Sequence, residues 1–93
     1  AGVIGLTRSL SREVGDDNIT VNAITPGFTE SDTQLASSTQ AYMADRSAQY
    51  QRRAFKRAQV PDDLVGAVMF LASDASDFMT GQTLNVDGGE SMH

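Results

Sequence analysis

The sequence contains no cysteine and no tryptophan, and its 93 residues include two prolines, two tyrosines and one histidine. Without cysteine the protein can form no disulfide, thiolate nucleophile or cysteine-ligated metal site. No apolar run approaches the roughly 20 residues that a membrane-spanning helix requires. The first residues, AGVIGLTRSLSREVG, lack the basic segment followed by a long apolar one that marks a targeting signal. We therefore expect a soluble protein of the reducing cytoplasm.

Positive charge is scarce, because 7 basic residues face 12 acidic ones and leave a net charge of -5. Such a chain repels phosphate backbones, so nucleic acid is not an expected partner, and nothing in the sequence predicts a membrane partner. The exception is a basic cluster formed by Arg46, Arg52, Arg53, Lys56 and Arg57. We interpret the cluster as a solvated helix face, with an anion-attracting rim as the alternative.

Hydrophobic periodicity predicts two helices. Apolar spacings of three and four in residues 1–15 indicate an amphipathic helix that ends near Gly15, a natural breaker. A second helix begins at Pro61, with Asp62 and Asp63 at its positive end. Residues 64–72 leave this second helix almost no polar face, so it must be covered on more than one side. One cover is its own sheet, and the other is a possible partner subunit.

Two strands are expected between and after the helices. Residues 19–25 are rich in β-branched side chains and are ended by Pro26-Gly27, while residues 82–86 alternate like a short strand. Residues 28–58 are polar and too long for a simple connection, which predicts a substrate lid or binding loop. Because a helix separates the strands, they should pair in parallel through a crossover connection.

The expected fold class is α/β, but two parallel strands cannot form a stable sheet by themselves. They would leave open edges and too little core, and the first helix has no Ser, Thr, Asp or Asn cap at its start. We therefore expect residues 1–93 to be the C-terminal piece of a larger doubly wound domain, without an independent domain of their own.

A candidate site follows the first strand, because ligands of open parallel sheets bind beyond the carboxyl ends of the strands. Pro26 fixes its φ angle, Gly27 permits close approach to the backbone, and Thr29 and Ser31 supply hydroxyl and N–H groups. Such a set can hold an amide or phosphate oxygen, although Pro-Gly after a strand is most often only a turn. Asn22 is expected to tie backbone segments together, not to act in catalysis.

Three segments carry a family resemblance: AGVIGLTRSLSREVGDDNITVNAITPGFTESD, RAQVPDDLVGAVMFLASDAS and TGQTLNVDGG. In order and spacing they resemble the C-terminal third of the classical short-chain dehydrogenases/reductases. The resemblance covers residues 1 to about 89 and implies a Rossmann-type fold. It also implies an oxidoreductase that moves hydride between NAD or NADP and a small alcohol or ketone.

The resemblance assigns cofactor contacts to the residues after the first strand. Pro26 and Gly27 would line the nicotinamide ring, the backbone at Thr29 would meet the carboxamide, and Ser31 would contact the diphosphate. The family more often has an aliphatic residue where Thr29 stands and Thr where Ser31 stands. No metal site is implied, since a single C-terminal His93 has no second ligand at metal spacing.

The family's catalytic Tyr and Lys precede AGVIGLTRSL on the same helix, so the resemblance implies that this piece alone has no activity. Tyr42 and Tyr50 are not replacements, because neither has a lysine four residues later; they are interpreted as lid residues, structural or substrate-facing. The family also implies a homotetramer through the 61–73 helix and the 82–86 strand. A non-catalytic scaffold subunit with the same fold is the alternative.

Overall fold

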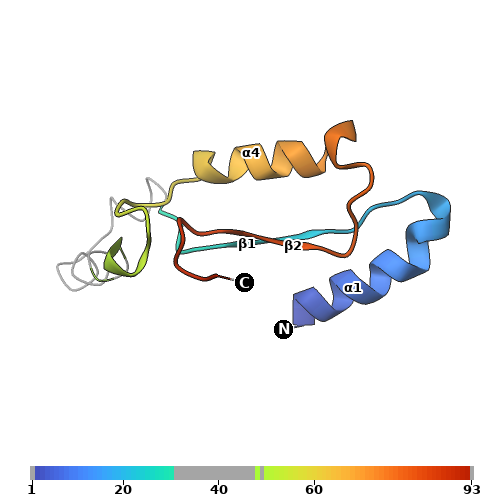
Figure 1. Ribbon diagram of the computed structural model, residues 1–93, viewed down its shortest axis with the longest axis horizontal. Coiled ribbons are helices and arrows are strands. Elements are labelled where there is room, and N and C mark those ends of the chain that lie inside the picture. Colours follow the sequence, from blue (N-terminus) through green and yellow to red (C-terminus); the bar gives the residue numbers. More distant parts are fainter. Residues whose placement is uncertain (1, 31–47, 49, 93) are drawn as a thin grey trace. The chain divides into compact units, whose positions relative to one another are not determined.

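The structure, a computed structural model, describes residues 2–30, 48 and 50–92. Its two longer helices are α1 (Gly2–Val14) and α4 (Asp62–Leu71), and its strands are β1 (Ala23–Pro26) and β2 (Thr83–Val86) (Figure 1). Short 3-10 turns cover Gly15–Asp17 and Asp74–Ser76, and residues 50–52 are helical. Most of the expected lid, including Ser31 and Tyr42, lies outside the described residues, as does His93.

The chain divides into two compact units. The first consists of Ala1–Thr25 and Gly66–Leu84, and the second of Pro26–Val65 and Asn85–His93. The division passes through β1, β2 and α4, so each of these elements contributes residues to both units. The candidate loop after β1 belongs to the second unit.

The two strands pair in parallel, as predicted. The Ala23 N–H donates to the Gln82 carbonyl at 2.9 Å, and the Gly27 N–H donates to the Val86 carbonyl at 3.2 Å. Both bonds join residues 59 positions apart, so the chain runs in the same direction along both strands. β1 and β2 form a two-stranded sheet within the described part of the chain.

The first strand is shorter than predicted and begins at Ala23, not at residue 19. The reason is that the preceding backbone bonds to the turn before β2 and not to a strand. The Val21 N–H donates to the Thr80 hydroxyl at 3.0 Å, and the Gly81 N–H donates to the Val21 carbonyl at 2.7 Å. Gly81 has a positive φ of +72°, a conformation that glycine adopts at no steric cost.

Asn22 joins these same segments, which confirms its predicted structural role. Its side-chain amide donates to the Met79 carbonyl at 3.1 Å, and its amide oxygen accepts from the Gln82 N–H at 3.1 Å. Both halves of the Asn22 amide are therefore used to connect the start of β1 to the start of β2.

Local hydrogen bonds and turn residues explain where α1 ends and where α4 begins. α1 runs into the Gly15 turn, and Asn18 then takes a left-handed conformation with φ of 60°. At the start of α4, the carboxylate of Asp63, the second residue of the helix, accepts the Val60 N–H at 2.9 Å and so caps the helix start. The predicted helix over residues 61–73 is observed as Asp62–Leu71. Just after its end, the Ser73 hydroxyl donates to the Phe70 carbonyl at 2.9 Å.

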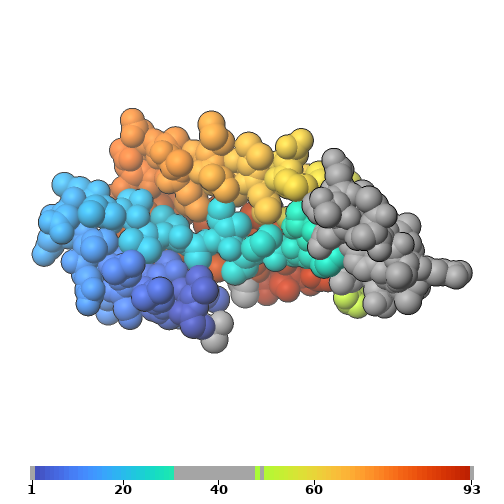
Figure 2. All heavy atoms as spheres, turned by 180° about the vertical axis from the view of Figure 1, so that it is seen from behind, coloured from blue at the N-terminus to red at the C-terminus, as the bar shows by residue number. Residues whose placement is uncertain are grey.

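Figure 2 shows the α4 segment, coloured yellow to orange, at the surface of the molecule. Several of its apolar side chains are exposed. Val65 and Val68 are each 52% exposed and Met69 is 66% exposed. Among the described residues, Ala23 is the one apolar residue classed as buried. Leu64, Ala67 and Leu71 on another side of the helix are half-buried. The described part of this chain therefore leaves the side of α4 that carries Val65, Val68 and Met69 without cover. No helix in that part is long and apolar enough to cross a membrane.

Candidate functional site

The candidate site is the loop Pro26 to Glu30, which begins at the last residue of β1. The Gly27 N–H bonds to Val86 at the end of β2, and the Thr29 hydroxyl donates to the Gly27 carbonyl at 3.0 Å. The Glu30 N–H donates to the Gln59 carbonyl at 2.8 Å, beside a parallel bridge between Thr29 and Gln59. The loop is thus held by backbone bonds at both of its ends.

A side chain at Gly27 would force neighbouring side chains to shift. A Cβ at Gly27 would lie 2.9 Å from the Gln59 amide oxygen and 3.0 Å from the Asp87 Cβ. An Arg53 guanidinium nitrogen would lie 3.2 Å away. The close approach that the sequence predicted at Gly27 is therefore made by side chains of this chain.

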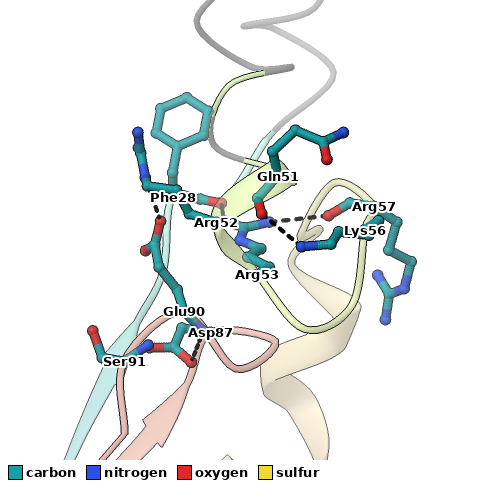
Figure 3. A network of polar contacts seen from close by, with 9 residues as sticks. All are labelled: Phe28, Gln51, Arg52, Arg53, Lys56, Arg57, Asp87, Glu90 and Ser91. Atoms are coloured by element: carbon teal, nitrogen blue, oxygen red, sulfur yellow. Dashed lines mark hydrogen bonds and ion pairs between the residues drawn. The ribbon is translucent and has the colours of Figure 1, made fainter.

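Arg53 holds the middle of the loop (Figure 3). Its residue is 2% exposed, and its guanidinium donates to the Phe28 carbonyl at 2.8 Å and to the Arg57 carbonyl at 3.1 Å. Arg53 Nε is also buried and has no hydrogen-bond partner among the described residues. Burying a guanidinium is costly, so these two bonds replace hydration that Arg53 has lost.

Gln59 and Glu30 complete the support of the loop. Gln59 is 5% exposed, and its side-chain amide donates to the Val86 carbonyl at 2.6 Å. Its amide oxygen faces Gly27 and is buried without a hydrogen-bond donor among the described residues. The Glu30 carboxylate accepts the Tyr50 hydroxyl at 2.6 Å. Tyr50 thus makes a structural contact, one of the two roles predicted for it.

Asp87 organises the turn after β2. Its carboxylate accepts the backbone N–H groups of Gly89, Glu90 and Ser91 at 3.1 to 3.2 Å. Gly88 and Gly89 both have positive φ, which explains the Asp-Gly-Gly sequence at this turn. The turn is tied to the basic segment, because the Phe55 N–H donates to the Gly88 carbonyl at 2.9 Å.

These segments line an open pocket of about 430 Å³ within the second unit. Its lining includes Arg53, Phe55, Gln59, Val86, Asp87 and Gly89. The pocket therefore lies against the side chains that support the loop. Within the part of the chain that the structure describes, no group of three or more His, Cys, Asp or Glu residues could hold a metal ion.

Arg57 and Asp63 form an ion pair at the start of α4. Two guanidinium nitrogens of Arg57 donate to the two carboxylate oxygens of Asp63, each at 2.8 Å. This pairing, together with the Val60 N–H, holds the pKa of Asp63 well below its usual range. The same pairing raises the pKa of Arg57.

The basic cluster is not simply the solvated helix face that the sequence favoured. Arg53 is buried against backbone carbonyls, and Lys56 donates to the Gln51 carbonyl at 2.6 Å. Arg52 pairs with Glu90 at 3.4 Å, with 60% of its side chain exposed. The interpretation is wrong for Arg53 because its guanidinium exchanges water for the carbonyls of Phe28 and Arg57. Arg46 lies outside the described residues.

Three of the four predicted cofactor residues, Pro26, Gly27 and Thr29, lie on this one loop, and Ser31 falls outside the described residues. Sequence reasoning missed Arg53 and Gln59, whose partners are 25 and 27 residues away along the chain. No local pattern predicts such contacts. The Asp87 turn had a usable signal, since Asp followed by Gly-Gly favours side-chain capping of a turn.

Comparisons with known proteins agree with this architecture. A family model described as Enoyl-(Acyl carrier protein) reductase matches residues 1–91. The Rhizobium meliloti (strain 1021) protein named "Probable galactose dehydrogenase GalD" is 45% identical over 91 residues, which is 96% of this chain and 34% of that protein. The 3-oxoacyl-[acyl-carrier-protein] reductase FabG of Rickettsia felis (strain ATCC VR-1525 / URRWXCal2) is 43% identical over 95 residues, covering 96% of this chain and 35% of FabG.

A solved structure from Agrobacterium tumefaciens, a candidate 2-deoxy-D-gluconate 3-dehydrogenase with bound NADP, is also similar. It superimposes with a TM-score of 0.83 at 40% identity, over 96% of this chain and 35% of that one. The chain spans about a third of the length of the relatives that it matches. The parallel strands and these Rossmann-type relatives establish the α/β fold class. The chain belongs to the short-chain dehydrogenase/reductase family.

Proposed function

We propose that this chain is the C-terminal third of a longer NAD- or NADP-dependent oxidoreductase. The longer protein would transfer hydride between nicotinamide and a small alcohol or ketone, with the proton exchanged at the substrate oxygen. Family membership supports this function, and so does the chain's coverage of about a third of its relatives. A solved relative with bound NADP supports the cofactor class.

The observation that carries the proposal is the anchored loop beyond the carboxyl end of β1. This is where ligands of open parallel sheets bind. Pro26 and Gly27 would line the nicotinamide ring, the backbone at Thr29 would meet the carboxamide, and Ser31 would contact the diphosphate. The Thr29 hydroxyl already bonds to Gly27, so the Thr29 contact with the cofactor is assigned to its backbone.

The remaining parts of the chain receive roles in the same longer protein. Residues 28–58 would form the substrate lid. The helix over 61–73 and the strand over 82–86 would meet their counterparts in a homotetramer, and the exposed apolar side chains of α4 support this assignment. The proton-transfer residues would be supplied from outside residues 1–93, so the 93-residue chain alone would be inactive.

Titration of the longer protein with NADH and NADPH, followed by nicotinamide fluorescence, tests the proposal. We expect saturable binding of at least one nucleotide and turnover of a small alcohol or ketone. The 93-residue chain should show no turnover under the same conditions. Failure of the longer protein to bind either nucleotide would contradict the proposed function.

A further inference from the structure

We propose that Arg53 and Gln59 are positioning residues that fix the Pro26 to Glu30 loop for the cofactor. This inference rests on the proposed function for the role of the loop, but the contacts themselves do not depend on it. Neither side chain is proposed to touch the substrate or to take part in proton transfer. They would act by holding the backbone of the loop in one place.

The two residues hold different points of the loop. Arg53 donates to the Phe28 carbonyl at 2.8 Å, in the middle of the loop. The Gln59 backbone accepts the Glu30 N–H at 2.8 Å, at the far end. The Gln59 side chain bonds to the Val86 carbonyl at 2.6 Å, and the same carbonyl accepts the Gly27 N–H at 3.2 Å. The loop is thus fixed at its start, middle and end.

Burial makes these contacts specific. Arg53 is 2% exposed and Gln59 is 5% exposed, so neither side chain is free to exchange its partners with water. Both also face the position of a Cβ on Gly27, which only glycine leaves open. An arginine at the surface would restrict the motion of the loop little. A buried guanidinium that bonds to the carbonyls of Phe28 and Arg57 restricts the backbone at both residues.

The structure offers a matched control beside Arg53. Arg52 is the same residue type one position earlier, but its side chain is 60% exposed and pairs with Glu90 at 3.4 Å. Arg53→Met and Arg52→Met therefore remove the same charge from adjacent positions. The difference between them isolates the contact with the loop. Methionine is comparable in length and tolerates burial, so Arg53→Met is expected to leave the protein folded.

Two measurements on the longer protein separate the contacts from their consequence. Amide hydrogen exchange at Gly27 and Glu30, without nucleotide, reports the order of the loop. The dissociation constant of NADH or NADPH reports its effect on the cofactor. We expect Arg53→Met to speed exchange at both amides and to raise the dissociation constant about tenfold, the size expected for one hydrogen bond from a charged group. Arg52→Met should change neither quantity.

Each outcome decides a different point. Unchanged exchange in Arg53→Met would overturn the positioning role, and faster exchange with unchanged nucleotide affinity would overturn its link to the cofactor. Faster exchange in a protein whose wild type binds no nucleotide would contradict the proposed function and leave the contacts intact. If Arg53→Met does not fold, Gln59→Leu provides the same test, because it removes the bond to Val86 without removing a charge. Wild-type exchange and affinity in Gln59→Leu would then overturn the inference.

Discussion

At the scale of single residues, Gly27 has the most demanding position in the described loop. Its φ is not in the left-handed region, so backbone conformation does not require glycine here. The position favours glycine because neighbouring side chains lie where a Cβ would be. The Gln59 amide oxygen, the Asp87 Cβ and the Arg53 guanidinium all occupy the space that a Cβ would need. Glycine here permits three neighbouring side chains to approach the backbone, and the same approach sets the path of the loop.

Gly27→Ala in the longer protein should therefore move the loop. A Cβ at 2.9 Å from the Gln59 amide oxygen forces a shift, which we expect to raise the KM for nucleotide about tenfold, with a smaller effect on kcat. Steady-state kinetics with nucleotide as the varied substrate measures both. The control is the double-mutant cycle with Gln59→Ala, which removes the nearest clash. Additive effects of the two substitutions would show that Gln59 does not determine the cost at Gly27.

At the scale of elements, the start of α4 depends on one carboxylate. Asp63 pairs with both nitrogens of Arg57 and accepts the Val60 N–H, and its pKa is lowered accordingly. A carboxyl with a lowered folded-state pKa contributes stability above its unfolded pKa of about 3.9. That contribution is lost as the pH falls from about 4 toward the folded-state value. Because the pair is exposed to solvent, its contribution is further reduced by salt.

Asp63→Asn should lower the free energy of unfolding at pH 7 and should lose less further stability than the wild type between pH 5 and pH 2. Urea unfolding of the longer protein at both ends of this range checks the sign. Asp62→Asn is the matched control, because it removes an adjacent acidic charge from the same first turn without removing the Arg57 pair or the Val60 cap. Equal pH profiles for the two variants would contradict the assigned role of Asp63.

The sequence predicts elements better than it predicts the support of the site. Periodicity and breakers located α1, α4 and both strands. The start of β1 was misplaced because Val21 pairs with a turn that is about 60 residues away. The burial of Arg53 could not be predicted for a similar reason. The sequence of a basic cluster does not show which of its arginines is buried. Contacts between distant segments depend on tertiary structure, which local patterns do not contain.

At the scale of the whole molecule, the described residues leave substantial apolar surface without cover. Val65, Val68 and Met69 of α4 are at least half exposed, although this helix has almost no polar face. Leu6 and Val3 of α1 are also more than 60% exposed. Surfaces of this composition are normally covered in native proteins. Both the proposed remainder of the domain and the proposed homotetramer would supply such cover.

Met69→Glu in the longer protein tests the assignment of α4 to an oligomer interface. Met69 is 66% exposed in this chain, and a carboxylate buried there on assembly would cost several kcal/mol. We expect sedimentation velocity to show dissociation into smaller species. Thr20→Glu adds the same charge at an exposed position between α1 and β1 and should leave the oligomeric state unchanged. An unchanged sedimentation coefficient in Met69→Glu would exclude this face of α4 from any interface.

A structure of the longer protein in complex with NADH or NADPH would show whether the loop after β1 is the nicotinamide side of a cofactor site. We expect the nicotinamide ring to lie in van der Waals contact, within about 4 Å, with Pro26 and Gly27. A bound nucleotide whose nicotinamide ring makes no contact with residues 26–30 would contradict it.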